Sequence, residues 1–297
     1  MEEIIKRFIR TLRSENTKKN YERYIKEFCE YKKISTFEDF KEIDIDDYYD
    51  WKEYLQKEKH NSENTLRPKL ISISSFYEYL CSIPKYEINV NPISKSNMLK
   101  NIKKTRNPER ITWLTSKERT DFLNYCNSPR EKAMFAIFCN TAIRVTELID
   151  LDLNKYVRYT NKEGKPSSYI VFTRKGGKRQ TLYLNPYVTK AIEEYLPYRK
   201  ESEYSNLFIS NSGKPMTTVC IDRTIKKIAK RAGINKNISA HSFRRTVATD
   251  MHKEGVDLLT IQHALGHSSP NTTQLYIQDT ENDMENIMMN YVVKGNV

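Results

Sequence analysis

Apolar residues at helical spacing dominate the first ninety positions and constrain the fold of this chain more than any other feature. In the clearest segment they follow one another at intervals of 4, 3, 4 and 3 residues, which lines one face of a helix. These residues are Leu66, Leu70, Ile73, Tyr77 and Leu80. The pattern recurs in earlier segments at 4–12, 21–31 and 45–55. We therefore expect a compact helical domain in which each helix buries one face.

A basic stretch without periodic apolar residues follows this helical region. Residues 93–110 contain six basic side chains and a single acidic one, Glu109. This change of character predicts an N-terminal domain at 1–92, a linker at 93–112 and a second domain at 113–297. A linker of this charge can lie along the phosphates of a nucleic acid, and a solvated connector would have the same composition.

Local signals predict helices around one small sheet in the second domain. Thr115 precedes Glu118 by three positions, which is the spacing of a capping box at a helix start, and Ser128 and Glu131 repeat it. Two β-type runs, 169–173 and 180–184, are joined by RKGGKR, which indicates an antiparallel hairpin with a basic tip. Helical patterns follow at 186–199, 217–231, 241–253, 256–265 and 281–291. The predicted fold class is mainly α, with two domains and one small antiparallel β-sheet.

Charge and composition narrow the classes of function. The chain has 50 Lys and Arg against 38 Asp and Glu, a net charge of +12, which favours polyanions or anionic membrane surfaces as partners. No stretch approaches the roughly 20 apolar residues of a membrane span, so a cytoplasmic protein is expected. The five cysteines form no CxxC pair and suggest neither a disulfide framework nor a zinc site. We interpret them as small buried apolar residues.

Two clusters in the first half of the second domain carry groups suited to phosphate. Arg144 and Glu147 are three apart in TAIRVTEL, and they would share a helix face. The alternative for this pair is an ordinary helix ion pair. The hairpin tip contains Lys175 and Lys178 beside two glycines that let the backbone approach a ligand. Basic tips of this kind are also common as solvated surface.

Two further clusters lie toward the C-terminus. His241 and Arg244 are three apart in HSFRRT and can face the same point from the start of a helix. The second cluster, LGHSSPNTTQLY, places His267 after a glycine and nine residues before Tyr276. Taken singly, either histidine would more often be a structural residue with satisfied hydrogen bonds.

The order of these groups along the chain resembles the tyrosine recombinase, or phage integrase, family. TAIRVTEL resembles the first-arginine box of the family, HSFRRT its HxxR box, and LGHSSPNTTQLY its box from GH to tyrosine. NTLRPKLISISSFYEYL followed by NPI is similar to the end of the family's core-binding domain. The resemblance spans nearly the whole chain and is strongest to the short, Xer-like, two-domain members. It implies a helical, SAM-like core-binding domain followed by a catalytic domain.

The resemblance also implies a role for each group. Tyr276 would be the nucleophile that forms a covalent 3′-phosphotyrosine, and Arg144 and Arg244 would neutralise the non-bridging oxygens. Lys175 would be the general acid for the 5′-oxygen, with Lys178 as the weaker alternative. His241 would act as base or proton relay, and His267 would bond the scissile phosphate. The chain carries no P-loop signature and no acidic cluster for two metal ions, so neither a metal nor a nucleotide cofactor is expected.

Some positions depart from the commonest family pattern without removing a catalytic group. Ala142 stands where glycine is usual, Thr146 where serine is frequent, and Arg245 where a second histidine often follows. Arg245 can alter the local phosphate contacts.

Implied partners are double-stranded DNA with paired inverted-repeat half-sites and other copies of the chain. A tetramer is expected at synapsis, with the C-terminal tail around 284–291 docking on a neighbour or on its own domain. Candidate DNA contacts, each equally explained as exposed charge, are Lys18, Lys19, Arg23, Arg67, Lys69, Lys103 and Lys104. Alternative functions are topoisomerase IB-like strand relaxation and a DNA-binding regulator that has lost catalysis.

Overall fold

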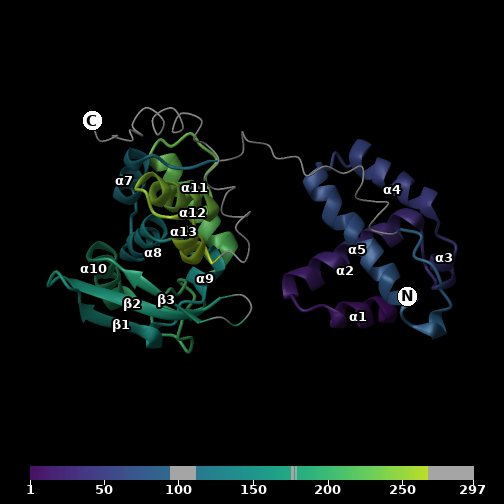
Figure 1. The fold of residues 1–297 in the computed structure, drawn as a ribbon, viewed down its shortest axis with the longest axis horizontal. Helices are drawn as coiled ribbons and strands as arrows, with labels where there is room; N and C mark the ends of the chain where they lie inside the picture. Colours follow the sequence, from purple (N-terminus) through teal and green to yellow (C-terminus); the bar gives the residue numbers. More distant parts are fainter. Residues whose placement is uncertain (94–111, 175–176, 178, 267–297) are drawn as a thin grey trace, which may run out of the picture. The chain divides into compact units, whose positions relative to one another are not determined.

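The computed structural model describes residues 1–93, 112–174, 177 and 179–266 of the chain. Contacts divide the chain into two compact units, Met1–Asn107 and Pro108–Val297 (Figure 1). In the described ranges, every helix is too short or too polar to cross a membrane.

The first unit is a small helical domain, as predicted. Its helices are α1 (Glu2–Thr11), α2 (Glu15–Lys32), α3 (Glu38–Lys41), α4 (Ile45–Lys57) and α5 (Glu63–Cys81), followed by the 3-10 turn η1 (Pro84–Tyr86). The four segments expected from periodicity correspond to α1, α2, α4 and α5, whereas the single turn of α3 is too short for a periodic pattern to show. Helices α2 and α5 pack against each other.

Aromatic residues form the centre of this first core. The side chains of Phe28, Phe40 and Trp51 are fully buried, and the rings of Phe28 and Trp51 meet edge to face at 4.9 Å. Leu66, Leu70, Ile73, Tyr77 and Leu80 are all buried. The face predicted from their spacing is therefore the packed face of α5.

Helices also make up most of the second unit. They are α7 (Ser116–Asn124), α8 (Pro129–Asn140), α9 (Val145–Ile149), α10 (Pro186–Tyr195), α11 (Thr218–Arg231), α12 (Ala240–Lys253) and α13 (Leu258–Leu265), with 3-10 turns η3 (Leu153–Lys155) and η4 (Leu196–Tyr198). Thr115 and Glu118 form the expected capping box at the start of α7. Ser128 caps α8 as expected, but Glu131 accepts a hydrogen bond from the Asn127 amide instead of completing a box. The helical pattern at 281–291 lies outside the described residues.

The sheet of the second unit has three antiparallel strands in the order β1-β2-β3. They are β1 (Tyr156–Thr160), β2 (Pro166–Thr173) and β3 (Arg179–Leu184). The β2–β3 hairpin confirms the prediction, with Thr173 paired to Arg179 beside the tip. Strand β1 was not expected, although a turn with Gly164 at a φ of 76° marks its connection to β2. Ile170 and Phe172 of β2 enter the core, and α10 packs on β2 and β3.

The expectation for the cysteines is only partly met. Cys126 and Cys139 are buried in the second unit, where burial raises the pKa of each thiol to about 12. Cys29, Cys81 and Cys220 are half-buried instead, because each lies near the edge of the packed face of its helix. The buried pair are inert packing residues, since a neutral thiol is a poor nucleophile.

Candidate active site

Arg144 is the N-cap residue of α9 and has an extended backbone. It therefore precedes the helix on which we expected it to share a face with Glu147. Its guanidinium donates to Glu147 Oε1 at 2.7 Å, and its backbone amide donates to Glu147 Oε2 at 2.9 Å. The Glu147 side chain is only 6% exposed, whereas that of Arg144 is 37% exposed. The ion-pair alternative is therefore real, but it leaves the arginine open to solvent.

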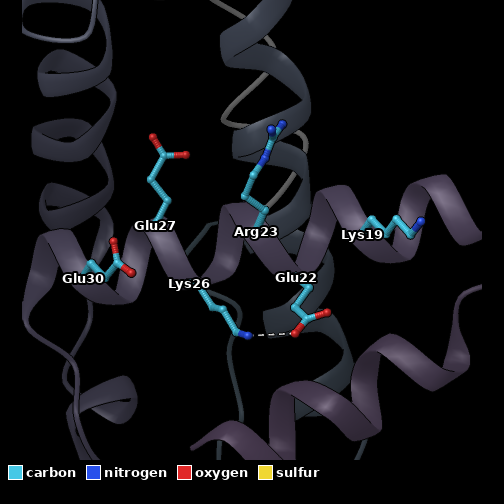
Figure 2. Close-up of a pocket in the computed structure, with 6 residues that line it drawn as sticks. All are labelled: Lys19, Glu22, Arg23, Lys26, Glu27 and Glu30. Carbon is cyan, nitrogen blue, oxygen red and sulfur yellow. Dashed lines mark hydrogen bonds and ion pairs between the residues drawn. The ribbon is translucent and has the colours of Figure 1, made fainter. Parts of the chain in front are cut away.

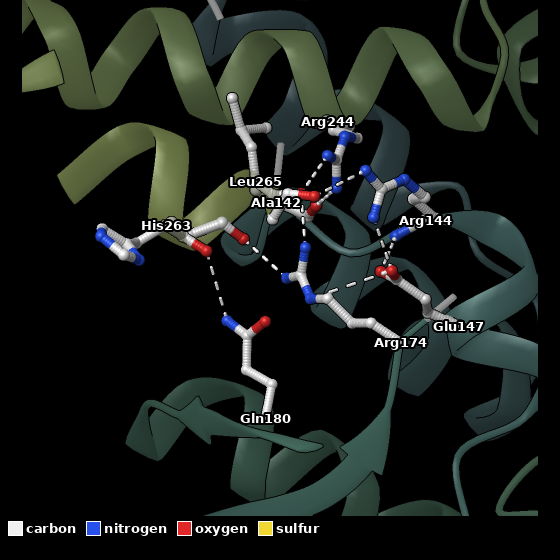
Figure 3. Close-up of polar contacts among 10 residues, drawn as sticks. Ala142, Arg144, Glu147, Arg174, Gln180, Arg244, His263 and Leu265 are labelled. Atoms are coloured by element: carbon white, nitrogen blue, oxygen red, sulfur yellow. Dashed lines mark hydrogen bonds and ion pairs between the residues drawn. The ribbon is translucent and has the colours of Figure 1, made fainter. Parts of the chain in front are cut away.

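Arg244 is buried in the first half of α12, at 2% exposure. Its guanidinium donates to the carbonyl oxygens of Ala142 and Leu265, so it joins the residues before α9 to the end of α13 (Figure 3). Ala142 does not have a positive φ, so its backbone conformation does not require glycine.

Arg174, the first residue of RKGGKR, does not fit the alternative of solvated surface. It directly follows β2, and its side chain is only 7% exposed. It donates to the carbonyl oxygens of Leu265 and Ala264, the latter at 2.8 Å, and its Nε lies 3.9 Å from Glu147 Oε1. The position was overlooked because neighbouring lysines and glycines suggested an exposed loop. The apolar strand directly before Arg174 was the signal that it can turn inward.

The C-terminal end of α13 is where these arginines converge. The last carbonyl groups of a helix lack partners within the helix and carry its negative dipole end. Arg174 and Arg244 bond such carbonyls, and Arg144 Nη2 donates to Gly266 O at 3.1 Å. Figure 3 shows the three guanidinium groups pointing toward this end of the helix, with Glu147 beside them. The cluster has more positive than negative charge, which suits an anion.

Gly266 makes this close approach possible. It caps α13 in the left-handed region at a φ of 58°, where glycine is favoured. A Cβ at this position would lie 1.6 Å from Nη1 of Arg174 and 2.4 Å from its Cζ. The backbone thus favours glycine in the LGH motif, and a side chain there would force the Arg174 guanidinium to move.

His241 starts α12 near the same cations. Although its side chain is exposed on one side, desolvation by its packed surroundings and the charges of Arg245, Arg244 and Arg144 lower its pKa to about 4. Its imidazole is therefore neutral at neutral pH and able to accept a proton. The three-residue spacing between His241 and Arg244 is that of neighbours along one side of a helix.

The remaining predicted catalytic residues, Lys175, His267 and Tyr276, lie outside the described residues, as do Lys178, Lys103, Lys104 and the tail at 284–291. The structure thus brings together Arg144, His241 and Arg244 from the predicted set and adds Arg174. Within the described ranges, no three His, Cys, Asp or Glu side chains are grouped to hold a metal ion.

The predicted DNA contacts of the first unit differ in their exposure to solvent and in whether they already form an ion pair. Lys19 and Arg23 are exposed on α2, in a shallow, mixed-charge hollow that also contains Lys26 and three glutamates (Figure 2). Arg67 is half-buried, and Lys18 donates to Glu15 at 2.7 Å.

Lys69 is different because its ammonium is already engaged. The side chain is 10% exposed and donates to Glu27 Oε1 at 2.6 Å, which ties α5 to α2. Its ammonium also lies 5.8 Å from the centre of the Tyr24 ring. The structure thus shows Lys69 in a packing contact between α5 and α2, and its predicted DNA contact stays a prediction.

Sequence profiles of two known families match the chain. The profile described as the phage integrase family covers residues 112–283, more than half of the chain. The profile described as the phage integrase N-terminal SAM-like domain covers residues 5–82. The two matches fall on the second and the first unit respectively.

Individual relatives agree with these profiles. The protein named tyrosine recombinase XerC from Caldanaerobacter subterraneus subsp. tengcongensis is 33% identical over 242 residues, 79% of this chain and 64% of that protein. Tyrosine recombinase XerC from Leptospira interrogans is 27% identical over 301 residues, 97% of this chain and 92% of that protein. The chain thus spans slightly less than two thirds of the first relative and nearly all of the second.

A solved structure shows the same fold. It is that of the XerH site-specific recombinase bound to a palindromic difH substrate, described as a post-cleavage complex. The TM-score is 0.73 at 20% identity, over 92% of this chain and 79% of that one.

Proposed function

Because this chain belongs to the phage integrase family, we propose that it is a tyrosine-type, site-specific DNA recombinase that acts through a covalent 3′-phosphotyrosine at Tyr276. The observation that carries the proposal is the convergence of Arg144, Arg174 and Arg244 at the end of α13. His267 follows Gly266, the C-cap residue of α13, by one residue and Tyr276 follows it by ten. The three arginines carry more positive charge than the single buried carboxylate, that of Glu147, can balance. Such an excess of positive charge suits a phosphodiester.

Transfer of a DNA strand to tyrosine requires three things of the protein. The negative charge on the non-bridging oxygens must be neutralised, which we assign to Arg144 and Arg244. The phenol, with an ordinary pKa of about 10, must lose a proton as it attacks phosphorus. The departing 5′-oxygen must gain a proton, which we assign to Lys175.

His241 is the proposed acceptor for the phenol proton. It is neutral before DNA binds, because desolvation and the arginines lower its pKa to about 4. A bound phosphate adds negative charge beside those arginines, which raises the proton affinity of the imidazole. Substrate binding therefore converts a poor base into a better one at the moment when it is needed. We assign a hydrogen bond to the scissile phosphate to His267.

Strand joining would reverse these steps. The phosphotyrosine linkage retains the energy of the broken phosphodiester, so a 5′-hydroxyl from another strand can attack it without a nucleotide cofactor.

Binding of DNA would involve both domains, proposed as 1–92 and 113–297 with the basic linker at 93–112. Contacts in the first domain are assigned to Lys19 and Arg23, which are exposed, with Lys18 and Arg67 as supporting positions. Lys103 and Lys104 would follow phosphates in the linker. We further propose a tetramer on paired inverted-repeat half-sites, with the C-terminal tail as the linking element. The expected cytoplasmic location stays a prediction.

A nicked half-site substrate tests the nucleophile. Incubation with the wild-type chain should give a covalent protein–DNA adduct on a denaturing gel, and Tyr276→Phe should give none. Tyr183→Phe is a matched control, because Tyr183 is 68% exposed on β3 and has no assigned role. An adduct formed by Tyr276→Phe would show that another residue is the nucleophile, and no adduct with the wild type would favour the regulator alternative.

The same substrate tests the arginines. Arg144→Ala and Arg244→Ala should each abolish adduct formation while DNA affinity falls only modestly, since most binding comes from other phosphate contacts. Product topology separates recombination from the topoisomerase alternative, which the names of the relatives do not favour. Recombinant junctions from two sites support our proposal, and stepwise relaxation of a single circle contradicts it.

A further inference from the structure

A row of three tyrosines, one from each strand, crosses the three-stranded sheet of the second unit. They are Tyr159 of β1, Tyr169 of β2 and Tyr183 of β3. Tyr169 lies directly opposite Tyr183 in the strand register. The ring centres of Tyr159 and Tyr169 are 6.0 Å apart, and so are those of Tyr169 and Tyr183. The three rings therefore form one continuous row, which we call the tyrosine strip.

The tyrosine strip lies on the face of the sheet that is turned away from α10. Successive side chains of a strand point to opposite faces. The hydroxyl oxygens of Ser168 and Thr189 of α10 are 2.8 Å apart, so Tyr169, the neighbour of Ser168, points away from that helix. Tyr183 is 68% exposed and Tyr159 is 39% exposed. The two outer rings of the strip are therefore open to solvent.

The exposed rings contribute little to the packed interior. None of the described residues that form or border the core of the second unit is one of these three tyrosines. Cross-strand pairing of rings stabilises a sheet modestly, which accounts for their mutual contact but not for their exposure. Val157 of β1 lies opposite Tyr169 and extends the exposed apolar surface. Contiguous exposed apolar surface of this kind indicates an interaction site.

Basic side chains border the tyrosine strip. Arg179, the first residue of β3, shares the face of Tyr183 because the two are four residues apart in one strand. Lys162 lies in the turn from β1 to β2, three residues after Tyr159. Both are exposed, and within the described ranges neither has an ion pair. The border of the strip therefore attracts an anionic partner.

A single strand of DNA fits this surface better than a second copy of the chain. The chain has a net charge of +12, so two copies meeting at this face would bring like charges together. A DNA strand instead supplies phosphates for the cations and a flat base for each ring. Exposed aromatic rings beside cations hold single strands in this way without reading their sequence. In a duplex the faces of the bases are already stacked on one another, so the strip would select single strands.

We propose that the tyrosine strip, formed by Tyr159, Tyr169 and Tyr183, is a binding site for single-stranded DNA. The source of such a strand rests on the proposed function, because strand exchange requires a cleaved strand to leave its complement before it joins another. Binding itself needs no cleavage. The site can therefore be tested separately from the proposed nucleophile.

Fluorescence anisotropy with the full chain tests the site. One probe is a labelled oligothymidine of about 16 nucleotides, within the range that single-strand binding sites cover. The other is a labelled duplex of the same length, measured at the same salt concentration. The quantity compared between variants is the ratio of the dissociation constant for the single strand to that for the duplex.

Tyr183→Leu is the principal variant because it keeps an apolar side chain and removes the most exposed ring. Loss of one base stack should raise the ratio about 10-fold, and Tyr159→Leu combined with Tyr183→Leu should raise it about 100-fold. Tyr198→Leu is the matched control, since Tyr198 is 72% exposed in η4, outside the sheet, and it should give the wild-type ratio. Tyr183→Phe keeps the ring and should also match the wild type, so it stays suitable as the control for the nucleophile.

Photocrosslinking gives a second measurement that needs no variant. Oligothymidine with 5-iodouracil at single positions should crosslink the wild-type chain, and mass spectrometry should place the crosslink on a tyrosine of the strip. This measurement decides the matter where a leucine variant does not fold.

Three results would overturn the inference while leaving the proposed function intact. The first is a wild-type ratio for the single and the double leucine variant, and the second is a crosslink that maps only outside the strip. The third is self-association, measured by light scattering, that Tyr183→Leu abolishes, because the strip would then hold a second copy. Absence of a covalent adduct on the nicked half-site would instead contradict the proposed function and leave these readouts unaffected.

Discussion

Gly266 allows the packing at the end of α13 to be measured as a free energy. A Cβ on Gly266 meets two penalties, a left-handed φ of 58° and a steric clash with the guanidinium of Arg174. Gly255, which follows α12, has a similar φ of 78° and no neighbouring atom within 4 Å of an added Cβ. Substitution of Gly255 by alanine therefore meets only the first penalty. Comparing Gly266→Ala with Gly255→Ala therefore separates the cost of backbone strain from the cost of the steric clash.

The expected magnitudes follow from these contacts. The left-handed conformation costs an alanine about 1 kcal/mol, which is the whole effect expected for Gly255→Ala. In Gly266→Ala the guanidinium of Arg174 must move and give up hydrogen bonds to Leu265 O and Ala264 O. Each bond from a charged donor contributes about 1.5 kcal/mol or more. The free energy of unfolding should therefore fall by about 4 kcal/mol for Gly266→Ala.

Urea denaturation followed by tryptophan fluorescence provides the assay. Of the two tryptophans, Trp51 belongs to the first unit and Trp113 to the second, so a Trp51→Phe background makes the signal report on the second unit. A double-mutant cycle adds the decisive point, because Arg174→Met removes the clashing group. In that background Gly266→Ala should cost only about 1 kcal/mol, like Gly255→Ala. Equal costs for Gly266→Ala and Gly255→Ala with Arg174 present would refute the packing argument.

Two further predictions concern the titration of His241 and the roles of the basic residues in the first unit. The folded-state pKa of His241 is about 4 against an ordinary value of 6.5, so the unfolded chain binds a proton first as the pH falls. The stability that comes from neutral His241 is complete above pH 6.5 and is lost as the pH falls from 6.5 to 4. In denaturation at several pH values, the free energy of unfolding should therefore fall more steeply over this range for the wild type than for His241→Gln. Lys69→Met should lower stability by about 1–2 kcal/mol, because Glu27 loses its partner, without reducing DNA affinity beyond the loss of one distant charge. Lys19→Met should change the free energy of unfolding by less than about 0.5 kcal/mol and reduce the salt dependence of DNA binding by about one counterion. A loss of DNA binding with Lys69→Met and a loss of stability with Lys19→Met would contradict both assignments.

Features set by neighbours in sequence were predictable. The buried face of α5 follows from intervals of three and four residues, and the start of α7 follows from Thr115 and Glu118. The β2–β3 hairpin follows from two β-type runs around a short basic tip. In each case the interaction lies within a few residues, so the local pattern contains it.

Features set by distant contacts were not predictable in the same way. Strand β1 is mostly exposed, so its sequence shows little alternation of apolar and polar residues, and it is placed by pairing with β2 and by bonds to Glu193. The ion pair of Lys69 with Glu27 joins two helices, and no local pattern indicates it. The inward turn of Arg174 depends on carbonyls 90 and 91 residues away. Such partners leave no periodic trace in the sequence.

The sequence by itself determined most of the elements, the family resemblance and the candidate residues Arg144, His241 and Arg244, because short motifs and chain order carry that information. Only the tertiary structure decided how these residues meet. The last carbonyls of α13 lack partners within the helix, and arginines from α12, from the end of β2 and from the start of α9 satisfy them. Gly266 leaves the space for the guanidinium of Arg174, and this steric requirement could be seen only once both side chains and backbone were placed.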